Sequence, residues 1–254
     1  MYSRRQFIKN CIASVAAVSL AGSFPLMSTA DAFSAVDIPV LLYHRVGDTE
    51  GPLTVTPERF AMDLARLRDS GYSTITLETF RKFITNSDIE LPEKPIMISF
   101  DDGYLDNFMN AYPILRRYGM TAAFYIITGM VNEEDRLAVG HIREMSANGM
   151  SIGSHTVSHR ALGELDNEAA LSELVLSRAY LEGMLQKSVD FVAYPKGSYN
   201  ESTGTEADEA GYSGGFSVIP GTCSHNISPF VLRRIPIFSF DGDVRRIVMK
   251  WENA

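Results

Sequence analysis

Two adjacent carboxylates and a pair of histidines are the residues whose types and spacing suggest chemistry in this chain. Asp101 and Asp102 directly follow the apolar run from Ile96 to Phe100. His155 and His159 follow a second short strand-like run, spaced as i and i+4. Two histidines and one carboxylate are a common ligand set for catalytic zinc, and they leave a position open for water. The residues therefore predict a catalytic metal site; the alternative is a turn with two solvated acids and two ordinary surface histidines.

These groups need strands to position them. The run that precedes Asp101 is apolar throughout, which is typical of a strand buried on both faces in a parallel sheet. Gly103 ends it, because glycine adopts backbone angles that a β-carbon forbids. Both carboxylates then lie at the carboxyl end of a strand, where α/β folds place their chemistry. The spacing of His155 and His159 predicts that both imidazoles lie on one side of a helical turn.

The rest of the chain alternates between strands and helices. Apolar runs predict further strands at residues 37–44, 72–76, 121–127, 150–154, 189–194, 212–217 and 232–237. Apolar spacing and end signals predict helices at residues 57–70, 79–84, 105–118, 141–148, 167–185 and 206–210, the fifth capped by Asn167. This alternation indicates a parallel sheet with right-handed crossovers in a single α/β domain.

The first 32 residues are predicted to be an export signal. Residues 3–9 carry the pair Arg4 and Arg5 in a pattern that matches a twin-arginine signal, and residues 11–24 are too short an apolar run to span a bilayer. Cleavage is expected near Ala30 or Ala32, which leaves a domain at residues 33–254. A plain secretory leader is the alternative. Both kinds of signal predict a periplasmic or extracellular protein with no stable membrane span after cleavage.

The charge balance narrows the class of partner. The 254 residues are 45% hydrophobic and 21% charged, which is ordinary for a globular protein. The formal net charge is −8, and the predicted leader carries a net +2, so the mature chain carries about −10. So acidic a protein is a poor candidate for binding nucleic acid or an anionic membrane. Cys223 is the single cysteine left after cleavage, so no intrachain disulfide is expected.

Both motifs resemble those of the polysaccharide deacetylase family, also called the NodB homology domain or carbohydrate esterase family 4. The segment from Ser99 to Gly103 matches the family's first motif, T-F-D-D-G, and the segment from Ser154 to His159 matches its second. The resemblance extends from about Pro39 to Ile237. It implies a distorted (β/α)7 barrel and an acetylated polysaccharide or oligosaccharide as the partner.

The resemblance also implies roles for the motif residues. Asp102, His155 and His159 would hold a divalent metal, zinc first, with cobalt or nickel possible. Such a metal lowers the pKa of bound water toward about 7 and polarises a carbonyl. Asp101 would then be the general base that takes the proton of the water.

Three later motifs of the family are altered or absent. The third, R-x-P-Y/F, is matched by the segment from Ala193 to Lys196, in which alanine replaces the arginine. The backbone N–H of Lys196 could still hold an oxyanion, with Tyr194 and Pro195 beside it. Arg233 or Arg234 could replace the missing charge. The fourth motif, D-x-x-D-W, and the fifth, L-x-H, are not found.

The first strand offers a substitute for the missing late histidine. His44 follows Tyr43, and this pattern, with Tyr194-Pro195-x-Gly197, resembles the poly-N-acetylglucosamine deacetylases of biofilm systems, whose motifs are permuted. That resemblance implies that His44, rather than His225, is the general acid; a hydrogen-bonded core histidine is the alternative. The sequence thus predicts a metal-dependent N-deacetylase of N-acetylglucosamine polymers. An O-acetyl esterase acting on xylan or peptidoglycan, and a non-catalytic glycan-binding domain, remain alternatives.

Overall fold

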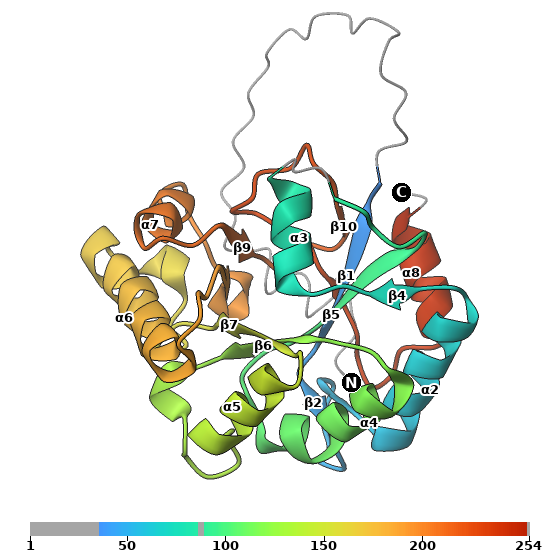
Figure 1. The fold of residues 1–254 in the computed structure, drawn as a ribbon. Helices are drawn as coiled ribbons and strands as arrows, with labels where there is room; N and C mark the ends of the chain where they lie inside the picture. The colour runs from blue at the N-terminus through green and yellow to red at the C-terminus, as the bar shows by residue number, and fades with distance from the viewer. Residues whose placement is uncertain (1–35, 86–88, 253–254) are drawn as a thin grey trace, which may run out of the picture.

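A curled sheet forms the centre of the molecule (Figure 1). The computed structural model describes residues 36–85 and 89–252, so the predicted leader lies outside the described residues. The strands of this sheet are β1 (Ile38–Tyr43), β4 (Ser73–Thr74), β5 (Pro95–Phe100), β6 (Ala123–Ile126), β7 (Ser151–Ser154), β8 (Phe191–Ala193), β9 (Gly214–Phe216), β10 (Thr222–Cys223) and β11 (Ile235–Pro236). Two short strands, β2 (Arg45–Val46) and β3 (Thr54–Val55), pair separately.

The order of the strands brings the end of the chain back to its first strand. The main path is β10-β1-β5-β6-β7-β8-β9, with β11 also beside β1 and β4 beside β5. All these pairs are parallel except β1 with β10. A single parallel bridge between Phe216 and Leu232 connects the edge of β9 to the segment that leads into β11. The sheet therefore curls into an incompletely closed barrel, and the predicted distorted (β/α)7 barrel of one domain is confirmed.

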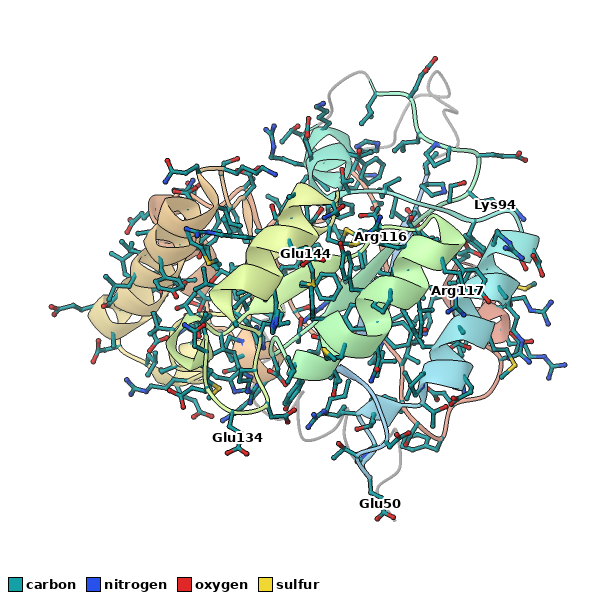
Figure 2. The ribbon with its side chains drawn as sticks, turned by 60° about the horizontal axis from the view of Figure 1, so that its bottom comes forward. Glu50, Lys94, Arg116, Arg117, Glu134 and Glu144 are labelled. Atoms are coloured by element: carbon teal, nitrogen blue, oxygen red, sulfur yellow. The ribbon has the colours of Figure 1, made fainter. Side chains whose placement is uncertain are left out.

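Helices cover the outside of the sheet. They are α2 (Pro57–Asp69), α4 (Tyr112–Tyr118), α5 (Val139–Ala147), α6 (Asn167–Leu185), α7 (Thr203–Glu209) and α8 (Val244–Glu252), whereas α3 (Leu77–Ile84) lies at one end of the barrel. Helix α2 packs against α4 and α8, and α6 packs against α5 and α7. Figure 1 shows these helices arranged around the strands. Figure 2 shows charged side chains of this layer, including Arg116, Arg117 and Glu144, which are exposed to solvent.

One predicted helix start agrees with the structure, and other predicted helices differ from it. Helix α2 begins as expected, with the Thr56 side chain accepting the N–H of Arg59. Helix α6 is capped by Asp166 instead of Asn167, because Asp166 has the extended backbone that a cap requires and accepts the N–H of Ala169. The region predicted as one helix at residues 105–118 contains a π-helix, Asn107–Ala111, before α4. Helix α8 and strand β10 were not predicted.

Two hydrophobic cores lie on opposite faces of the sheet. Leu41, Tyr43 and Phe100 belong to the outer core, between the strands and the helices. The inner core lies within the barrel and includes Val40, Met97, Tyr125, Phe191 and Phe216. Side chains of a strand alternate between its two faces, so each strand contributes to both cores. This alternation determines which residues at a strand end point into the barrel.

Helix α3 closes the barrel where its strands begin. Its residues Leu77, Phe80 and Phe83 are buried in the inner core. The backbone N–H of Leu77 donates to the hydroxyl of Ser151, the first residue of β7. The ring of Phe80 packs against Phe191, with 5.8 Å between ring centroids. The mouth of the barrel at the strands' amino ends is therefore filled with aromatic side chains.

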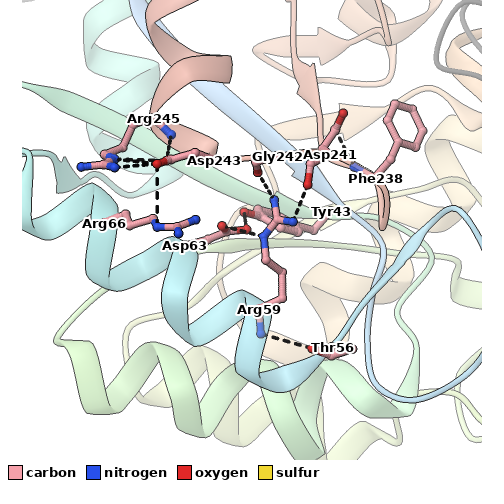
Figure 3. A network of polar contacts seen from close by, with 10 residues as sticks. All are labelled: Tyr43, Thr56, Arg59, Asp63, Arg66, Phe238, Asp241, Gly242, Asp243 and Arg245. Atoms are coloured by element: carbon pink, nitrogen blue, oxygen red, sulfur yellow. Dashed lines mark hydrogen bonds and ion pairs between the residues drawn. The ribbon is translucent and has the colours of Figure 1, made fainter.

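A polar network fixes the carboxyl end of β1 against α2 (Figure 3). The hydroxyl of Tyr43 donates to Asp63 over 3.2 Å, and the Arg59 guanidinium donates to the same carboxylate over 2.9 Å. Arg59 also donates to the backbone carbonyls of Asp241 and Gly242, each over 2.5 Å. The network thus ties the last residue of β1 to the segment that leads into α8.

None of the helices in the described ranges, 36–85 and 89–252, is long and apolar enough to cross a membrane.

Candidate active site

Strand register brings the predicted site residues to one rim of the barrel. Strands β1 and β5 pair up to their last residues, with Tyr43 opposite Phe100. The parallel register continues through β6 to β8. His44, Asp101 and His155 come directly after the last residues of β1, β5 and β7. They therefore meet at the carboxyl ends of the strands, where barrel folds hold their chemistry.

These residues also continue the rows that point into the barrel. Met97 lies in the inner core, so Asp101, four residues later, has the same orientation on the pleat. In β7 the corresponding row contains Gly153 and then His155. A β-carbon on Gly153 would lie 2.4 Å from Cε1 of Tyr125, so only glycine leaves room for that ring. The inner face of the sheet is thus packed by rings below and by ionisable groups at the rim.

Asp102, His155 and His159 converge as a possible metal site. One ligand atom from each lies within 4.8 Å of the others. Oδ1 of Asp102 lies 3.4 Å from Nε2 of His155 and 3.3 Å from Nε2 of His159. Two ligands each about 2.0–2.2 Å from a tetrahedral zinc lie about 3.4 Å apart, so these spacings fit such an ion.

The tautomer of His155 supports this fit. Its Nδ1 lies 2.7 Å from the carbonyl oxygen of Ala193, so Nδ1 carries the hydrogen and donates it. In the neutral ring, Nε2 then presents a lone pair toward the Asp102 carboxylate. Burial lowers the pKa of His155, but the Asp101 and Asp102 carboxylates outweigh burial and raise it. A cation between the lone pair and the carboxylate satisfies both groups, which is how metal-binding histidines are oriented.

The two histidines do not lie on a helical turn, so that prediction is wrong. The segment after β7 is irregular, and Thr156 and His159 have left-handed backbones with φ of 64° and 60°. The carbonyls of Thr156 and Val157 accept the N–H groups of Thr128 and Gly129. A β-carbon at Gly129 would lie 2.6 Å from the Val157 carbonyl oxygen. A tightly fastened loop, rather than helical periodicity, brings the imidazoles together.

Asp101 forms a buried ion pair with Arg234. The guanidinium donates to both carboxylate oxygens, over 2.7 and 2.8 Å, and Asp101 and Arg234 are 2% and 0% exposed. Nε of Arg234 donates to the carbonyl of Ser217 over 3.0 Å. Burial raises the pKa of Asp101, but Arg234 and then His155 outweigh this and keep it below its usual value. Of the two arginines considered from the sequence, Arg234 provides the charge, whereas Arg233 is exposed.

The backbone of Asp102 separates the two carboxylates. Its φ is 75°, so the chain turns sharply and directs the second side chain toward the histidines. Arg136 donates to the Asp102 carbonyl over 2.8 Å and stacks on the Tyr104 ring, whose other neighbour is the Arg45 guanidinium. Neither Arg136 nor Tyr104 was identified from the sequence, because their contribution depends on a contact between distant loops.

The candidate site residues line a pocket of about 180 Å³. It is lined by Leu42, His44, Leu53, Asp101, Asp102, His155, His159, Lys196 and Val218. Lys196 has a left-handed backbone with φ of 58°, and its side chain is exposed. Tyr194 and Pro195 are buried and do not line this pocket; the Tyr194 hydroxyl donates to the carbonyl of Phe230.

His44 and His225 lie at opposite ends of the barrel. His44 lines the pocket, and its buried Nδ1 has no hydrogen-bond partner among the described residues. Burial lowers the pKa of His44, although the two aspartates act in the opposite direction. His225 follows Cys223, which pairs with Ile38 at the start of β1, and its ring packs on Phe83 with 4.1 Å between centroids. The six residues of β1 place the two histidines about 20 Å apart.

Comparison with known sequences identifies relatives. Residues 88–215 match the family model described as polysaccharide deacetylase. A Bacillus subtilis protein named as a polysaccharide deacetylase, YxkH, is 33% identical over 200 residues, which cover 79% of this chain and 71% of that protein. The poly-beta-1,6-N-acetyl-D-glucosamine N-deacetylase of Staphylococcus aureus is 27% identical over 213 residues, 78% of this chain and 72% of that enzyme.

Solved structures agree with these sequence matches. The Streptococcus pyogenes deacetylase PplD, in complex with acetate, superposes with a TM-score of 0.80 at 28% identity, covering 86% of this chain and 99% of that one. The Bacillus cereus polysaccharide deacetylase BC0361 gives a TM-score of 0.76 at 28% identity, covering 84% and 69%. The family model, the relatives and the superpositions agree with the motifs and the rim geometry: the chain belongs to the polysaccharide deacetylase family and is a deacetylase.

Proposed function

We propose that this enzyme removes N-acetyl groups from a polysaccharide that contains N-acetylglucosamine, releasing acetate. One observation carries the proposal: the cluster of Asp102, His155 and His159 shares a single pocket with Asp101, whose carboxylate is held from behind by the buried Arg234. The class of polymer follows the Staphylococcus aureus relative, whose name specifies poly-beta-1,6-N-acetyl-D-glucosamine.

The family is metal-dependent, and Asp102, His155 and His159 are the residues that would hold the ion. Zinc suits two imidazoles and a carboxylate, and cobalt or nickel are the alternatives. The ion supplies Lewis-acid chemistry, which acidifies water and polarises a carbonyl. Asp101 accepts the proton of the attacking water as general base. Arg234 holds both oxygens of Asp101, so the base stays ionised and correctly oriented.

His44 is the proposed general acid. It lines the same pocket as Asp101 and Asp102, and its buried Nδ1 is left without a partner among the described residues. An imidazole with an ordinary pKa near ~6.5 suits delivery of a proton to the departing amine. Burial lowers the pKa of His44, which makes its protonated form a stronger donor, while the Asp102 and Asp101 carboxylates favour that protonated form. Because an amine is a poor leaving group, N-deacetylation needs this proton more than the cleavage of an acetyl ester does.

The backbone N–H of Lys196 is the proposed oxyanion donor. A backbone amide needs no particular side chain for this role, which fits the absence of the family's usual aromatic residue at Lys196. Pro195 begins the short turn that presents this amide, and Tyr194 anchors the turn through its hydrogen bond to Phe230. Tyr194 and Pro195 thus support the pocket wall and do not contact the substrate directly.

Acetate release from a panel of acetylated glycans tests the proposal. We expect release from poly-β-1,6-N-acetylglucosamine or chitooligosaccharides, and release slowed by about 10²–10⁴-fold in protein carrying Asp101→Asn. Preferential release from acetylated xylan or from O-acetylated peptidoglycan would identify an O-acetyl esterase. Glycan binding without acetate release from any member of the panel would identify a binding domain.

We also propose export through residues 1–32, by the twin-arginine route, to the periplasm or the cell exterior. Replacement of Arg4 and Arg5 by lysine keeps the charge, so a general secretory signal tolerates it. The receptor of a twin-arginine signal reads the guanidinium pair, so we expect the double variant to remain in the cytoplasm. Cell fractionation with an antibody to the mature domain provides the measurement, and unchanged export would indicate the general route.

A further inference from the structure

The loop between the two metal-site histidines encloses a carboxylate from a neighbouring helix. Glu173 of α6 accepts the backbone N–H of Val157 over 2.8 Å and that of Ser158 over 2.9 Å through Oε2. Its Oε1 accepts the hydroxyl of Ser158. Both oxygens of one side chain are therefore used by the residues between His155 and His159.

The backbone of this loop suits an anion. Thr156 is left-handed, and the next two N–H groups point toward one centre, as in the backbone nests that bind anions. Hydrogen bonds to an ionised acceptor are roughly twice as strong as bonds between neutral groups. Partial burial raises the pKa of Glu173, but the bonds donated by Ser158 and Val157 outweigh burial and lower it. Glu173 therefore holds the loop as a carboxylate.

His159 depends on this loop more than His155 does. The imidazole of His155 is fixed by its bond to the Ala193 carbonyl, and its backbone N–H donates to Ile126. Among the described contacts, the ring of His159 faces Asp102 and packs near His155, and its backbone N–H donates to the hydroxyl of Thr156. The direction in which His159 points is thus set by the course of residues 156–158.

We propose that Glu173 is a positioning residue of the metal site. It holds the segment after Thr156 in the conformation that brings Nε2 of His159 to the Asp102 carboxylate. The opposite side of the same loop is fastened by Thr128 and Gly129, so Glu173 completes a clamp from two elements. This inference rests on the proposed function only in that the three-residue cluster binds a metal.

Zinc affinity, measured by competition with a fluorescent chelator on purified full chain, tests the inference. Outer partners of metal ligands typically change metal affinity by about 10- to 100-fold when they are removed. We expect Glu173→Ala to fall within that range. We expect Glu173→Gln to lose less, about three- to tenfold, because its amide oxygen still accepts but its nitrogen cannot.

Glu182 provides a matched control on the same helix. It accepts the backbone N–H of Val189 over 3.0 Å and pairs with Arg178, so it also fastens a loop to α6, but it does not touch the metal-site loop. We expect Glu182→Ala and Glu182→Gln to keep the zinc affinity of the unmodified protein. Unfolding in urea, measured on metal-free protein, separates loss of stability from loss of affinity.

Each result is decisive. A graded loss from the unmodified protein to Glu173→Gln to Glu173→Ala, with the Glu182 variants unchanged, supports the inference; Glu173→Gln alone supports it if Glu173→Ala does not fold. Unchanged affinity in the Glu173 variants overturns it, as does an equal loss in the Glu182 variants. If the unmodified protein binds no zinc, cobalt or nickel, the proposed metal site itself is overturned and this inference falls with it.

Discussion

The two mouths of the barrel are built in opposite ways. At the strands' amino ends, α3 inserts Phe80 and Phe83 among other rings, so packed apolar side chains fill the opening. At the carboxyl ends, the same strands end in charged groups, including the fully buried pair of Asp101 and Arg234. Left-handed residues with β-carbons also occur at this end, among them Asp102. The amino mouth is built for stability, whereas the carboxyl mouth contains the strain and buried charge expected of a catalytic site.

Two histidines, one at each mouth, illustrate this difference. His225 packs on an aromatic ring at the amino mouth and is exposed, whereas His44 lies in the pocket at the carboxyl mouth. The two side chains are chemically identical, so their positions, after the carboxyl end of β1 and after β10, decide what each can do.

Removal of metal should have the largest effect. We expect a strong chelator to abolish acetate release and added Zn²⁺ or Co²⁺ to restore it, because three protein ligands leave a position open for reaction. The aromatic mouth should not respond, so near-ultraviolet circular dichroism from its rings should stay close to native. Full activity in protein shown to be metal-free by elemental analysis would contradict the metal site.

Asp101→Asn should lower the rate toward the upper part of about 10²–10⁴-fold, the usual contribution of a positioned base. The metal should stay bound, because Asp102 and not Asp101 faces both histidines. Elemental analysis measures the metal content of Asp101→Asn and of Asp102→Ala, and we expect only Asp102→Ala to lose metal. Equal metal content in the two variants would count against this division of roles.

His44→Ala should lower the rate of N-deacetylation by about 10²–10⁴-fold with metal content intact. His225→Ala is the control from the other mouth. Its deacetylation rate should stay within about threefold of that of the unmodified enzyme, since His225 lies far from the pocket. The loss in His44→Ala should shrink with an aryl acetate, whose leaving group needs no proton. A crippled His225→Ala beside a nearly normal His44→Ala would reverse the assignment of the general acid.

Phe80→Ala should change activity least and stability most. Removal of a buried phenylalanine typically lowers the free energy of unfolding by about 3–5 kcal/mol, because a cavity remains. Urea unfolding measures this loss, and the rate per folded molecule should match that of the unmodified enzyme. If this variant lost catalysis while keeping its stability, the amino mouth would have a part in the reaction.

Much of the site could be predicted because its residues follow strands that the sequence marks clearly. The apolar run before Asp101 and the glycine after Asp102 locate one strand end, and His44 ends another. The alternation of side chains then determines which residues face inward. Six of the residues predicted from the sequence line one pocket: His44, Asp101, Asp102, His155, His159 and Lys196.

The remaining features depend on information that sequence spacing does not contain. The i and i+4 spacing of His155 and His159 fits a helix, but the left-handed Thr156 makes the chain double back instead. The choice of Arg234 over Arg233 depends on the register of a two-residue strand. Glu173 acts through backbone N–H groups, which leave no signature in residue type. Helix α8, by contrast, could have been predicted from its apolar spacing at residues 244, 247, 248 and 251.

The incomplete seam between β9 and β11 has a consequence for how the protein folds. Strand β1 is flanked by β5 on one side and by β11, from the opposite end of the chain, on the other. Pairings this distant in sequence form slowly, because a long loop must close before any contact compensates for the lost entropy. Until they form, Asp101 has no guanidinium partner and stays hydrated. We therefore expect the amides of β11 and its neighbours to gain exchange protection last during refolding, and deacetylase activity to return in that same final phase.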